Sequence, residues 1–298
     1  MFDIIEPVHN INIKTMGSFS NFNPGLSPDG EKSLNFLEDD TVYVFIDAIA
    51  NFHHFILTIL TPALQVIELI DNKKLHFVLH SRSKKQIADN FDNLLIELLL
   101  EKSINYTSIN SNAYDYVNAK NFIPINGVSI EKGIPILYDY LIKKYNLPTA
   151  ITNKKIYVSR SRYGGEEKRI DDEKALEKLF EENGFQIVYP EEIKTFKEQF
   201  ELFNSCSVLA GLTGSGLTNL IFMPKNQIVL EIVTKLKIGV TDSSTGQVFT
   251  EEQIHDHYKE FSIIKDHIMI TIFNMDKSVE DVQKKIELTM KSLKLLSL

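Results

Sequence analysis

The chain has 298 residues, a length that predicts about two domains. Apolar residues make up 43% and charged residues 24%, which is the composition of a globular protein and excludes disorder of the chain as a whole. The 32 Lys and Arg residues are outnumbered by 40 Asp and Glu residues, so the formal net charge is -8. This balance excludes a broad nucleic-acid-binding face, which must be basic, but it is compatible with a local basic pocket for one small anion.

The cysteine content and the apolar runs of the sequence indicate in which cellular compartment the protein is expected. Cys206 is the one cysteine, so no intramolecular disulfide can form, which indicates a reducing compartment or no redox role. The N-terminus has neither the basic region nor the long apolar run of a signal peptide. Residues 52–70 are the most apolar stretch near it, but they include polar and histidine side chains and are expected to be too polar to span a membrane. We therefore expect a soluble, cytoplasmic protein with no transmembrane segment, for which peripheral membrane contact stays open.

In the first half of the chain, short apolar runs alternate with segments of helical spacing from residue 41 onwards. Residues 1–40 are mixed in composition, and we expect irregular structure there with at most one early strand. Pro62 is expected to kink or split the first helix, and Pro135 to lie in the first turn of the third. Residues 111–130 fit neither pattern. Strands are expected over 41–46, 75–80 and 104–109, and helices over 51–71, 84–101 and 131–145.

The second half repeats this alternation after residues 146–149, whose turn composition marks the expected domain boundary. Residues 235–265 stay unassigned. Strands are expected over 155–159, 185–189, 207–210, 228–233 and 268–273, and helices over 171–183, 195–203, 214–222 and 277–295.

Strands that alternate with helices in this way form parallel βαβ units. We therefore predict an α/β protein of two Rossmann-like lobes facing a cleft, with residues 1–148 in the first lobe and 149–298 in the second. The last helix, 277–295, is a candidate to pack back on the first lobe. Ligands of such folds bind at the carboxyl ends of the strands, often between lobes.

A glycine-rich turn follows the strand that ends near Gly211. Gly214 and Gly216 bracket Ser215 where a helix is expected to begin, so bare backbone N–H groups and the positive end of the helix dipole would face whatever lies above the strand. The spacing is neither G-x-x-x-x-G-K-[ST] nor G-x-G-x-x-G. The turn therefore either binds an anion or needs its glycines for packing only.

Two arginines, Arg160 and Arg162, come directly after the strand expected over 155–159. Residues two apart share a face of an extended chain, and guanidinium groups suit phosphate oxygens. On this segment alone, salt bridges to the acids within residues 166–171 are the better interpretation.

Histidines 53 and 54 begin the helix after the first expected strand. With an unperturbed pKa of ~6.5, His53 or His54 can serve as a general base near neutral pH. Adjacent helical residues point about 100° apart, so at most one of them would face a cleft. A packing or capping role explains them equally well.

Glu231 ends an apolar strand, where a carboxylate needs a partner. A ribose diol would supply one, and so would a neighbouring Arg or Lys. No metal site is expected, because the His-Asp-His run at 255–257 has no third ligand at a suitable spacing. Cys206 is expected to be a small core residue.

Taken together, the order and spacing of these segments resemble glycosyltransferase family 61, which includes bacterial capsule-type enzymes and the eukaryotic O-linked N-acetylglucosaminyl- and xylosyltransferases. The family pattern is roughly Y-[IV]-S-R, an acidic helix, G-F-x-[IV]-[IV], a helix with Phe and Gln, then G-x-H-G-A-G-L-[TS]-N-x-x-F-[ML]-P and a strand ending in Glu. The matching positions are Y-V-S-R at 157–160, G-F-Q-I-V at 184–188, Gln199, Phe203, G-L-T-G-S-G-L-T-N-L-I-F-M-P at 211–224, Glu231, and N-F-H-H-F at 51–55 for an upstream N-x-x-H segment.

The resemblance implies a GT-B architecture and inverting, metal-independent transfer of a hexose or pentose, with no cofactor. A nucleotide sugar, expected to be a UDP-sugar, would donate to a glycan acceptor in surface polysaccharide synthesis. His53 or His54 would deprotonate the acceptor, Arg160 and the start of the glycine-rich helix would bind the diphosphate, and Glu231 would hold the ribose. The substrate-binding positions that the resemblance implies are Asn51, Ser159, Arg160, Arg162, Thr213, Gly214, Ser215, Gly216, Asn219 and Glu231.

The chain departs from the family pattern in three places. Thr213 stands where His is usual, Ser215 where Ala is usual, and Leu57 or Thr58 where an acid often follows the first-lobe His. The identity of the base and a weakened or inactive enzyme therefore stay open. The alternatives are a non-catalytic nucleotide-sugar or glycan-binding protein of the same fold, and a different α/β enzyme with a phosphate-bearing cofactor, which the missing dinucleotide fingerprint disfavours.

Overall fold

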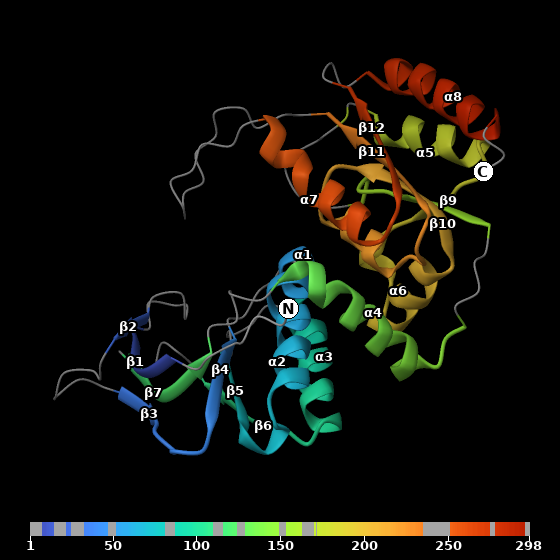
Figure 1. The fold of residues 1–298 in the computed structure, drawn as a ribbon. Helices are drawn as coiled ribbons and strands as arrows, with labels where there is room; N and C mark the ends of the chain where they lie inside the picture. Colours follow the sequence, from blue (N-terminus) through green and yellow to red (C-terminus); the bar gives the residue numbers. More distant parts are fainter. Residues whose placement is uncertain are drawn as a thin grey trace. The chain divides into compact units, whose positions relative to one another are not determined.

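The structure is a computed structural model in which the chain forms two compact units, Met1–Leu137 and Tyr138–Leu298 (Figure 1). The division falls inside helix α4 (Ile130–Tyr145), whereas the turn composition placed the boundary just after it, at residue 148. The residues that the structure describes are 8–14, 22–24, 33–46, 52–80, 87–109, 116–123, 129–148, 153–162, 170, 172–234, 251–274 and 278–295.

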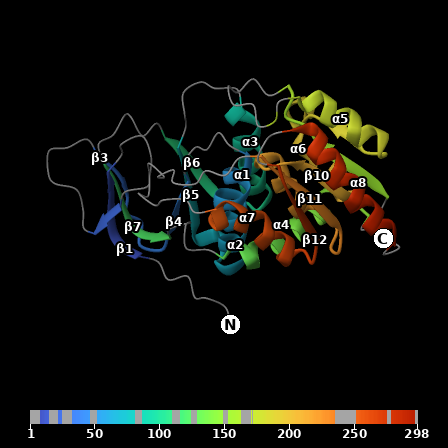
Figure 2. The same cartoon turned by 90° about the horizontal axis from the view of Figure 1, so that it is seen from above.

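The first unit contains a mixed seven-stranded sheet (Figure 2). The strand order is β2–β1–β7–β4–β5–β6, and β3 also pairs with β7. Strand β1 runs antiparallel to β2 and β7, and the other pairs are parallel. The strands are β1 (Val8–Lys14), β2 (Phe22–Pro24), β3 (Ser33–Phe36), β4 (Val42–Ile46), β5 (Leu75–His80), β6 (Asn105–Ile109) and β7 (Tyr116–Ile123).

Three of these strands lie before residue 40 and correct the expectation of at most one. Strand β7 lies in the stretch 111–130 that the sequence pattern left unassigned. The four strands are short or rich in Asn, so their local signal is weak. Hydrogen bonds to other strands decide their structure: β7 pairs with the distant strands β1 and β3, and β2 pairs with β1.

The helix after β4 changes its geometry along its length. It consists of α1 (Phe52–His54), the π-helical η1 (Phe55–Leu60) and α2 (Thr61–Leu69). Pro62 has no backbone N–H, and directly before it the Thr61 N–H bonds to the Ile56 carbonyl, five residues back. The effect of the proline is thus a π-helical widening instead of a break.

Among the described residues, one helix, Phe52–Leu69, is long and apolar enough to cross a membrane on length and composition. Of this segment, 67% is buried inside the structure, which is how core helices of globular units behave. The absence of a transmembrane segment stays a prediction.

Within the first unit, helix α2 and the first part of α4 approach closely at Gly133. A Cβ atom added there would lie 2.1 Å from Gln65 Nε2 and 2.1 Å from Thr61 Cγ2. The Gln65 amide also donates to the Ser129 carbonyl at 2.9 Å, directly before α4 begins. Glycine is required at this crossing. Pro135 lies inside α4, beyond the first turn in which it was expected.

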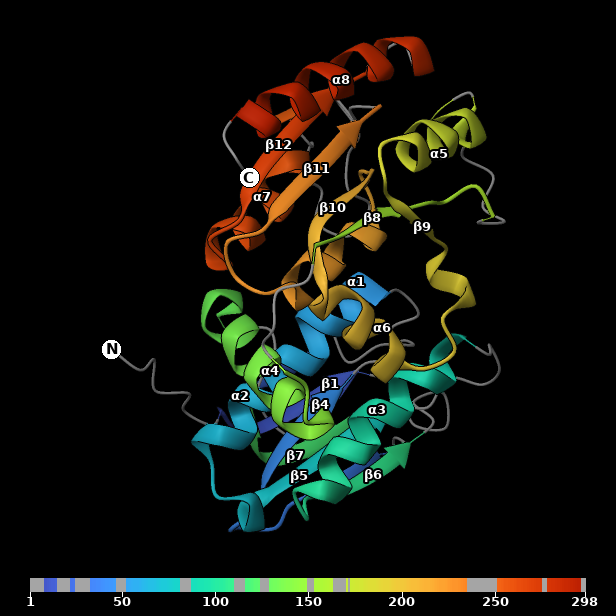
Figure 3. The ribbon, with the colours of Figure 1, turned by 90° about the vertical axis from the view of Figure 1, so that its right-hand side faces the viewer.

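The second unit contains a five-stranded, all-parallel sheet in the order β12–β11–β10–β8–β9 (Figure 3). Every strand expected after residue 150 is present. Because β9 pairs on one side of β8 and the later strands on the other, the chain reverses its direction across the sheet between β8 and β10. The strands are β8 (Lys154–Val158), β9 (Gln186–Val188), β10 (Cys206–Leu212), β11 (Ile228–Val233) and β12 (Ile268–Phe273).

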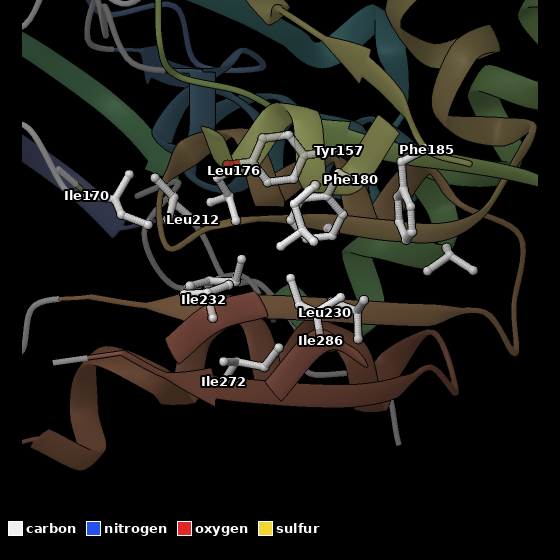
Figure 4. Close-up of a cluster of buried hydrophobic side chains, with 14 of the residues drawn as sticks. Tyr157, Ile170, Leu176, Phe180, Phe185, Leu212, Leu230, Ile232, Ile272 and Ile286 are labelled. Carbon is white, nitrogen blue, oxygen red and sulfur yellow. The ribbon is translucent and has the colours of Figure 1, made fainter. Parts of the chain in front are cut away.

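One face of this sheet is covered by α5 (Glu173–Glu182) and α8 (Val279–Leu295) (Figure 4). The rings of Tyr157 and Phe180 stack there with centroids 4.3 Å apart. Val282 and Ile286 of α8 are fully buried in the same cluster, so the last helix packs in the second unit. The 3-10 helix η6 (Ser215–Phe222) packs on the opposite face beside α6 (Phe196–Asn204) and α7 (Glu251–Ile264).

The close crossing at Gly133 predicts whether Gly133→Ala raises or lowers the free energy of unfolding. In an open helix, Gly133→Ala would stabilise by about 1 kcal/mol through helix propensity. Here we expect the free energy of unfolding to fall by roughly 1–3 kcal/mol, because the branched Thr61 side chain cannot swing away from the new methyl group. Urea denaturation measures the change. Lys132→Ala, on the exposed side of the same helix, is the control, and a Gly133→Ala variant more stable than this control would contradict the packing argument.

Candidate functional site

In each unit, a candidate segment follows the strand at the topological switch point, which is the strand whose two neighbours are reached by the chain in opposite directions across the sheet. In the second unit Val158 pairs with Gly211, so the segment after β8 and the turn after β10 leave neighbouring strands at the same sheet edge. In the first unit β4 pairs with β5 on one side and with the later β7 on the other, and the helix of the two histidines follows β4. Ligands of open α/β sheets bind at such points.

The glycine-rich turn packs tightly on the end of β8. A Cβ atom at Gly216 would lie 2.7 Å from Val158 Cγ1, and one at Gly211 would lie 3.3 Å from the Val158 carbonyl oxygen. Both glycines therefore serve packing, which is one of the two interpretations that the sequence allowed. This packing also brings the first residues of η6 against the end of β8, directly before Ser159 and Arg160, so it does not exclude an anion site.

Asn219 holds the glycine-rich turn from inside the unit. Its side chain is fully buried, its Nδ2 donates to the Gly216 carbonyl at 2.8 Å, and its Oδ1 accepts from Gln199 Nε2 of α6 at 2.7 Å. Both ends of the amide thus support the conformation of the turn. A direct contact of Asn219 with substrate stays a prediction.

Glu231 and Thr213 form a hydrogen-bonded pair on the face of the sheet that carries η6. Glu231 pairs in register with Gly211 and is fully buried. The Thr213 hydroxyl lies 2.9 Å from Glu231 Oε1 and 3.2 Å from the Ile232 carbonyl, so it has two acceptors for its proton. Burial raises the pKa of Glu231 to about 7, and the bond from Thr213 offsets part of that rise.

Two carboxylates of α5 bind the segment that carries Arg160. Glu173 Oε1 accepts from the backbone N–H of Arg160 at 2.7 Å. Glu177 Oε1 accepts from the hydroxyls of Ser159 and Ser161 at 2.5 Å each. The conformation of residues 159–161 is therefore set by a helix that is itself anchored in the core.

Arg162 is engaged by residues that follow β9. Its guanidinium pairs with Glu192, and its carbon Cζ lies 3.8 Å from the centroid of the Tyr189 ring. The structure confirms a salt bridge for Arg162, and its described partner, Glu192, lies in the 3-10 helix η5 (Pro190–Glu192). The acids that the sequence offered as partners lie outside the described residues. A contact of Arg162 with substrate stays a prediction.

The two histidines lie at the start of the helix after β4, and Asn51 before them lies outside the described residues. Their ring centroids are 5.3 Å apart at an interplanar angle of 85°, with His54 exposed and His53 half-buried. Leu57 is buried, and the Thr58 hydroxyl donates to the His54 carbonyl at 2.7 Å. The positions where the family pattern often has an acid therefore serve the core and the helix backbone.

Within the described part of the chain, no group of three or more His, Cys, Asp or Glu side chains is arranged to hold a metal ion. The side chains of residues 255–257 lie outside that part. Cys206 is buried, and burial raises the pKa of its thiol to about 12, as expected of a core residue.

The sequence matches the family model of Glycosyltransferase 61 over residues 52–230, which is more than half of the chain. The chain belongs to glycosyltransferase family 61. The match starts at the helix of His53 and ends in β11, so the glycosyltransferase 61 region includes the Arg160 segment and the glycine-rich turn. Membership confirms the resemblance read from the motifs and supports transfer of a sugar from a donor to an acceptor.

Comparisons outside the family add little. No curated protein matches this glycosyltransferase 61 chain significantly. Among solved structures, a short-chain dehydrogenase from Oenococcus oeni PSU-1 aligns with 12% identity over 80% of this chain and 97% of its own, at a TM-score of 0.17. A score this low carries no argument about fold or function.

Sequence reasoning missed Glu173 and Glu177 of this glycosyltransferase. Both lie on a helix rich in charged residues, where acids are ordinarily solvated. Their signal was the spacing of four residues, which places two side chains on one face of a helix. Only the packing of α5 on β8 shows that this face turns towards Ser159 and Arg160.

The raised pKa of Glu231 predicts a pH dependence of stability. Between its usual value of 4.5 and about 7, the folded protein keeps a proton that the unfolded chain has lost. The associated stability is fully present below pH ~4.5 and is lost as the pH rises to about 7, by roughly 3 kcal/mol. Glu231→Gln removes this dependence and keeps an acceptor for Thr213.

We therefore expect Glu231→Gln to gain stability relative to the wild type when both are moved from about pH 5 to about pH 8. Urea denaturation at both pH values measures the difference, with the exposed Glu181→Gln as the control. Parallel pH profiles for the wild type and Glu231→Gln would show that the buried carboxyl does not titrate in this window.

Proposed function

We propose that this protein is an inverting, metal-independent glycosyltransferase that moves a sugar from a nucleotide-diphosphate donor to a glycan acceptor. The observation that carries the proposal is the meeting of the Arg160 segment and the glycine-rich turn at the switch point of an all-parallel sheet, within a chain of family 61. A guanidinium and several backbone N–H groups are the donors that a diphosphate requires.

The leaving group determines what these residues do. As the bond between the sugar and the diphosphate breaks, negative charge grows on the diphosphate oxygens. Arg160 and the first N–H groups of η6, at Ser215 and Gly216, would stabilise that charge, and one such preorganised donor is commonly worth ~3 kcal/mol of barrier. On the acceptor side, His53 or His54 would take the proton of the attacking hydroxyl.

Glu231 would hold the ribose of the donor. Its carboxylate lies one strand from the turn, and ribose hydroxyls would share it with the Thr213 hydroxyl. We favour a UDP-sugar as donor, a GT-B arrangement of the two units, a role in surface polysaccharide synthesis and a cytoplasmic location. These finer parts rest on the likeness of the motifs to the family pattern.

A second candidate is a binding protein of the same fold that performs no transfer. The departures from the family pattern support it, because the Thr213 hydroxyl is engaged by Glu231 and because neither Leu57 nor Thr58 offers a carboxylate beside the histidines. Release of nucleoside diphosphate during incubation with a panel of nucleotide sugars and glycan acceptors separates transfer from binding.

The proposal predicts different effects for the two neighbouring arginines. Arg160→Ala should lower kcat/KM by about 100-fold or more, because it removes a donor to the leaving group. Arg162→Ala should change kcat/KM by less than about tenfold, because its guanidinium pairs with Glu192 and stacks on Tyr189. Steady-state release of nucleoside diphosphate measures both, and circular dichroism checks the fold. Unchanged activity of Arg160→Ala would end the assignment.

Metal independence has its own test. With Arg160 and the η6 amides neutralising the diphosphate, excess EDTA should leave the rate of transfer within about twofold of the untreated rate. The measurement is the same release assay, run on dialysed protein. Loss of activity with EDTA that Mg²⁺ or Mn²⁺ restores would contradict this part of the proposal.

A further inference from the structure

We propose that Glu173 and Glu177 are positioning residues that hold the segment of residues 159–162 in the conformation that binds the donor diphosphate. This inference rests on the proposed function and deepens it. It assigns a role to a carboxylate pair that the family pattern describes only as part of an acidic helix.

The helix that carries the two carboxylates is fixed to the sheet. Phe180 of α5 stacks on Tyr157 of β8 with the ring planes 17° apart, and Leu176 between the two glutamates is fully buried. The Asp172 side chain accepts from the Ala175 N–H at 3.0 Å and so caps the start of the helix. Glu173 and Glu177, one turn apart, are therefore presented from a rigid support.

Each carboxylate binds a different part of the segment. Glu173 Oε1 accepts from the backbone N–H of Arg160 at 2.7 Å and lies 3.3 Å from the Tyr157 hydroxyl. The contact is made to the arginine's own peptide group, so it fixes the point from which the Arg160 side chain starts. An ionised carboxylate only accepts hydrogen bonds, which matches the donors around it.

Glu177 connects the segment to the next strand. One of its oxygens accepts from the hydroxyls of Ser159 and Ser161, and the other accepts from the Tyr189 hydroxyl at 3.1 Å. The Ser159 hydroxyl oxygen in turn accepts from the Ser161 N–H at 3.0 Å. The turn after β8 is thus closed on itself and tied to the residue that follows β9.

Electrostatics alone predicts that Glu173 and Glu177 weaken the binding of a diphosphate, whereas a positioning role predicts that they strengthen it. Two negative charges beside a phosphate site repel the ligand, so removing one would tighten binding. If the carboxylates act by holding the Arg160 segment, removing one loosens the segment and weakens binding. The sign of the change therefore separates a positioning role from a mere charge effect.

The test is a double-mutant cycle read by calorimetric titration with UDP and GDP. We expect Glu173→Ala and Glu177→Ala each to weaken Kd by about tenfold relative to Glu181→Ala, which removes an exposed charge from the same helix. Glu173→Gln, which keeps an acceptor for the Arg160 N–H, should restore Kd to within about threefold of the control. In an Arg160→Ala background, Glu173→Ala should cause no further loss, because its effect passes through Arg160.

The outcomes that overturn the inference are equally specific. They are tighter binding by both Glu173→Ala and Glu173→Gln, equal Kd values for Glu173→Ala and Glu181→Ala, or an undiminished loss in the Arg160→Ala background. Thermal unfolding confirms that each variant is folded at the titration temperature.

A separate readout distinguishes this inference from the proposed function. Backbone hydrogen exchange of residues 159–162 should be faster in Glu173→Ala than in Glu181→Ala, whether or not a nucleotide binds. If the wild type binds no nucleoside diphosphate, the proposed function fails. Faster exchange in Glu173→Ala would still show that Glu173 fixes the conformation of residues 159–162. Unchanged exchange overturns the inference even if the nucleotide binds.

Discussion

The close approach of η6 to the end of β8 is the constraint on which the second unit depends. Val158 occupies the space that side chains at positions 211 and 216 would need, so glycine is required on both sides of the turn. This contact lies between the two strands where the chain reverses its direction across the sheet. The backbone N–H groups at the start of η6 therefore come to the edge where an open α/β sheet binds its ligands.

Three acids organise the same edge: Glu231 is fully buried, and Glu173 and Glu177 are half-buried. Glu173 and Glu177 accept from a peptide N–H and from hydroxyls, and Glu231 accepts from the Thr213 hydroxyl. Buried carboxylates are costly unless such donors surround them, and burial raises the pKa of both Glu173 and Glu231. Their hydrogen bonds tie the segments after β8 and β10 to helix α5 and to strand β11.

Membership in glycosyltransferase family 61 and the geometry of the second unit support the same chemistry from separate directions. The family match identifies a class of reaction, and the sheet topology brings the Arg160 segment and the glycine-rich turn, which we propose to bind the diphosphate, to the same edge. The departures from the family pattern have structural counterparts. Thr213 pairs with Glu231, and Leu57 lies in the core of a helix that Pro62 makes partly π-helical. These local solutions explain how the chain accommodates the altered residues.

The sequence by itself determined the family, the alternation of strands and helices from residue 41 onwards, and the positions of Arg160 and the glycine-rich turn at strand ends. These properties depend on neighbouring residues or on the order of motifs along the chain, because hydrophobic periodicity, turn residues and motif spacing can all be read from one sequence. Only the tertiary structure decided the early strands, the place of the last helix against α5, the partner of Arg162 and the roles of Glu173 and Glu177. Each of these depends on which distant segment lies opposite a given side chain, and an exposed acid and a buried, bonded one look the same in sequence until packing brings their partners together.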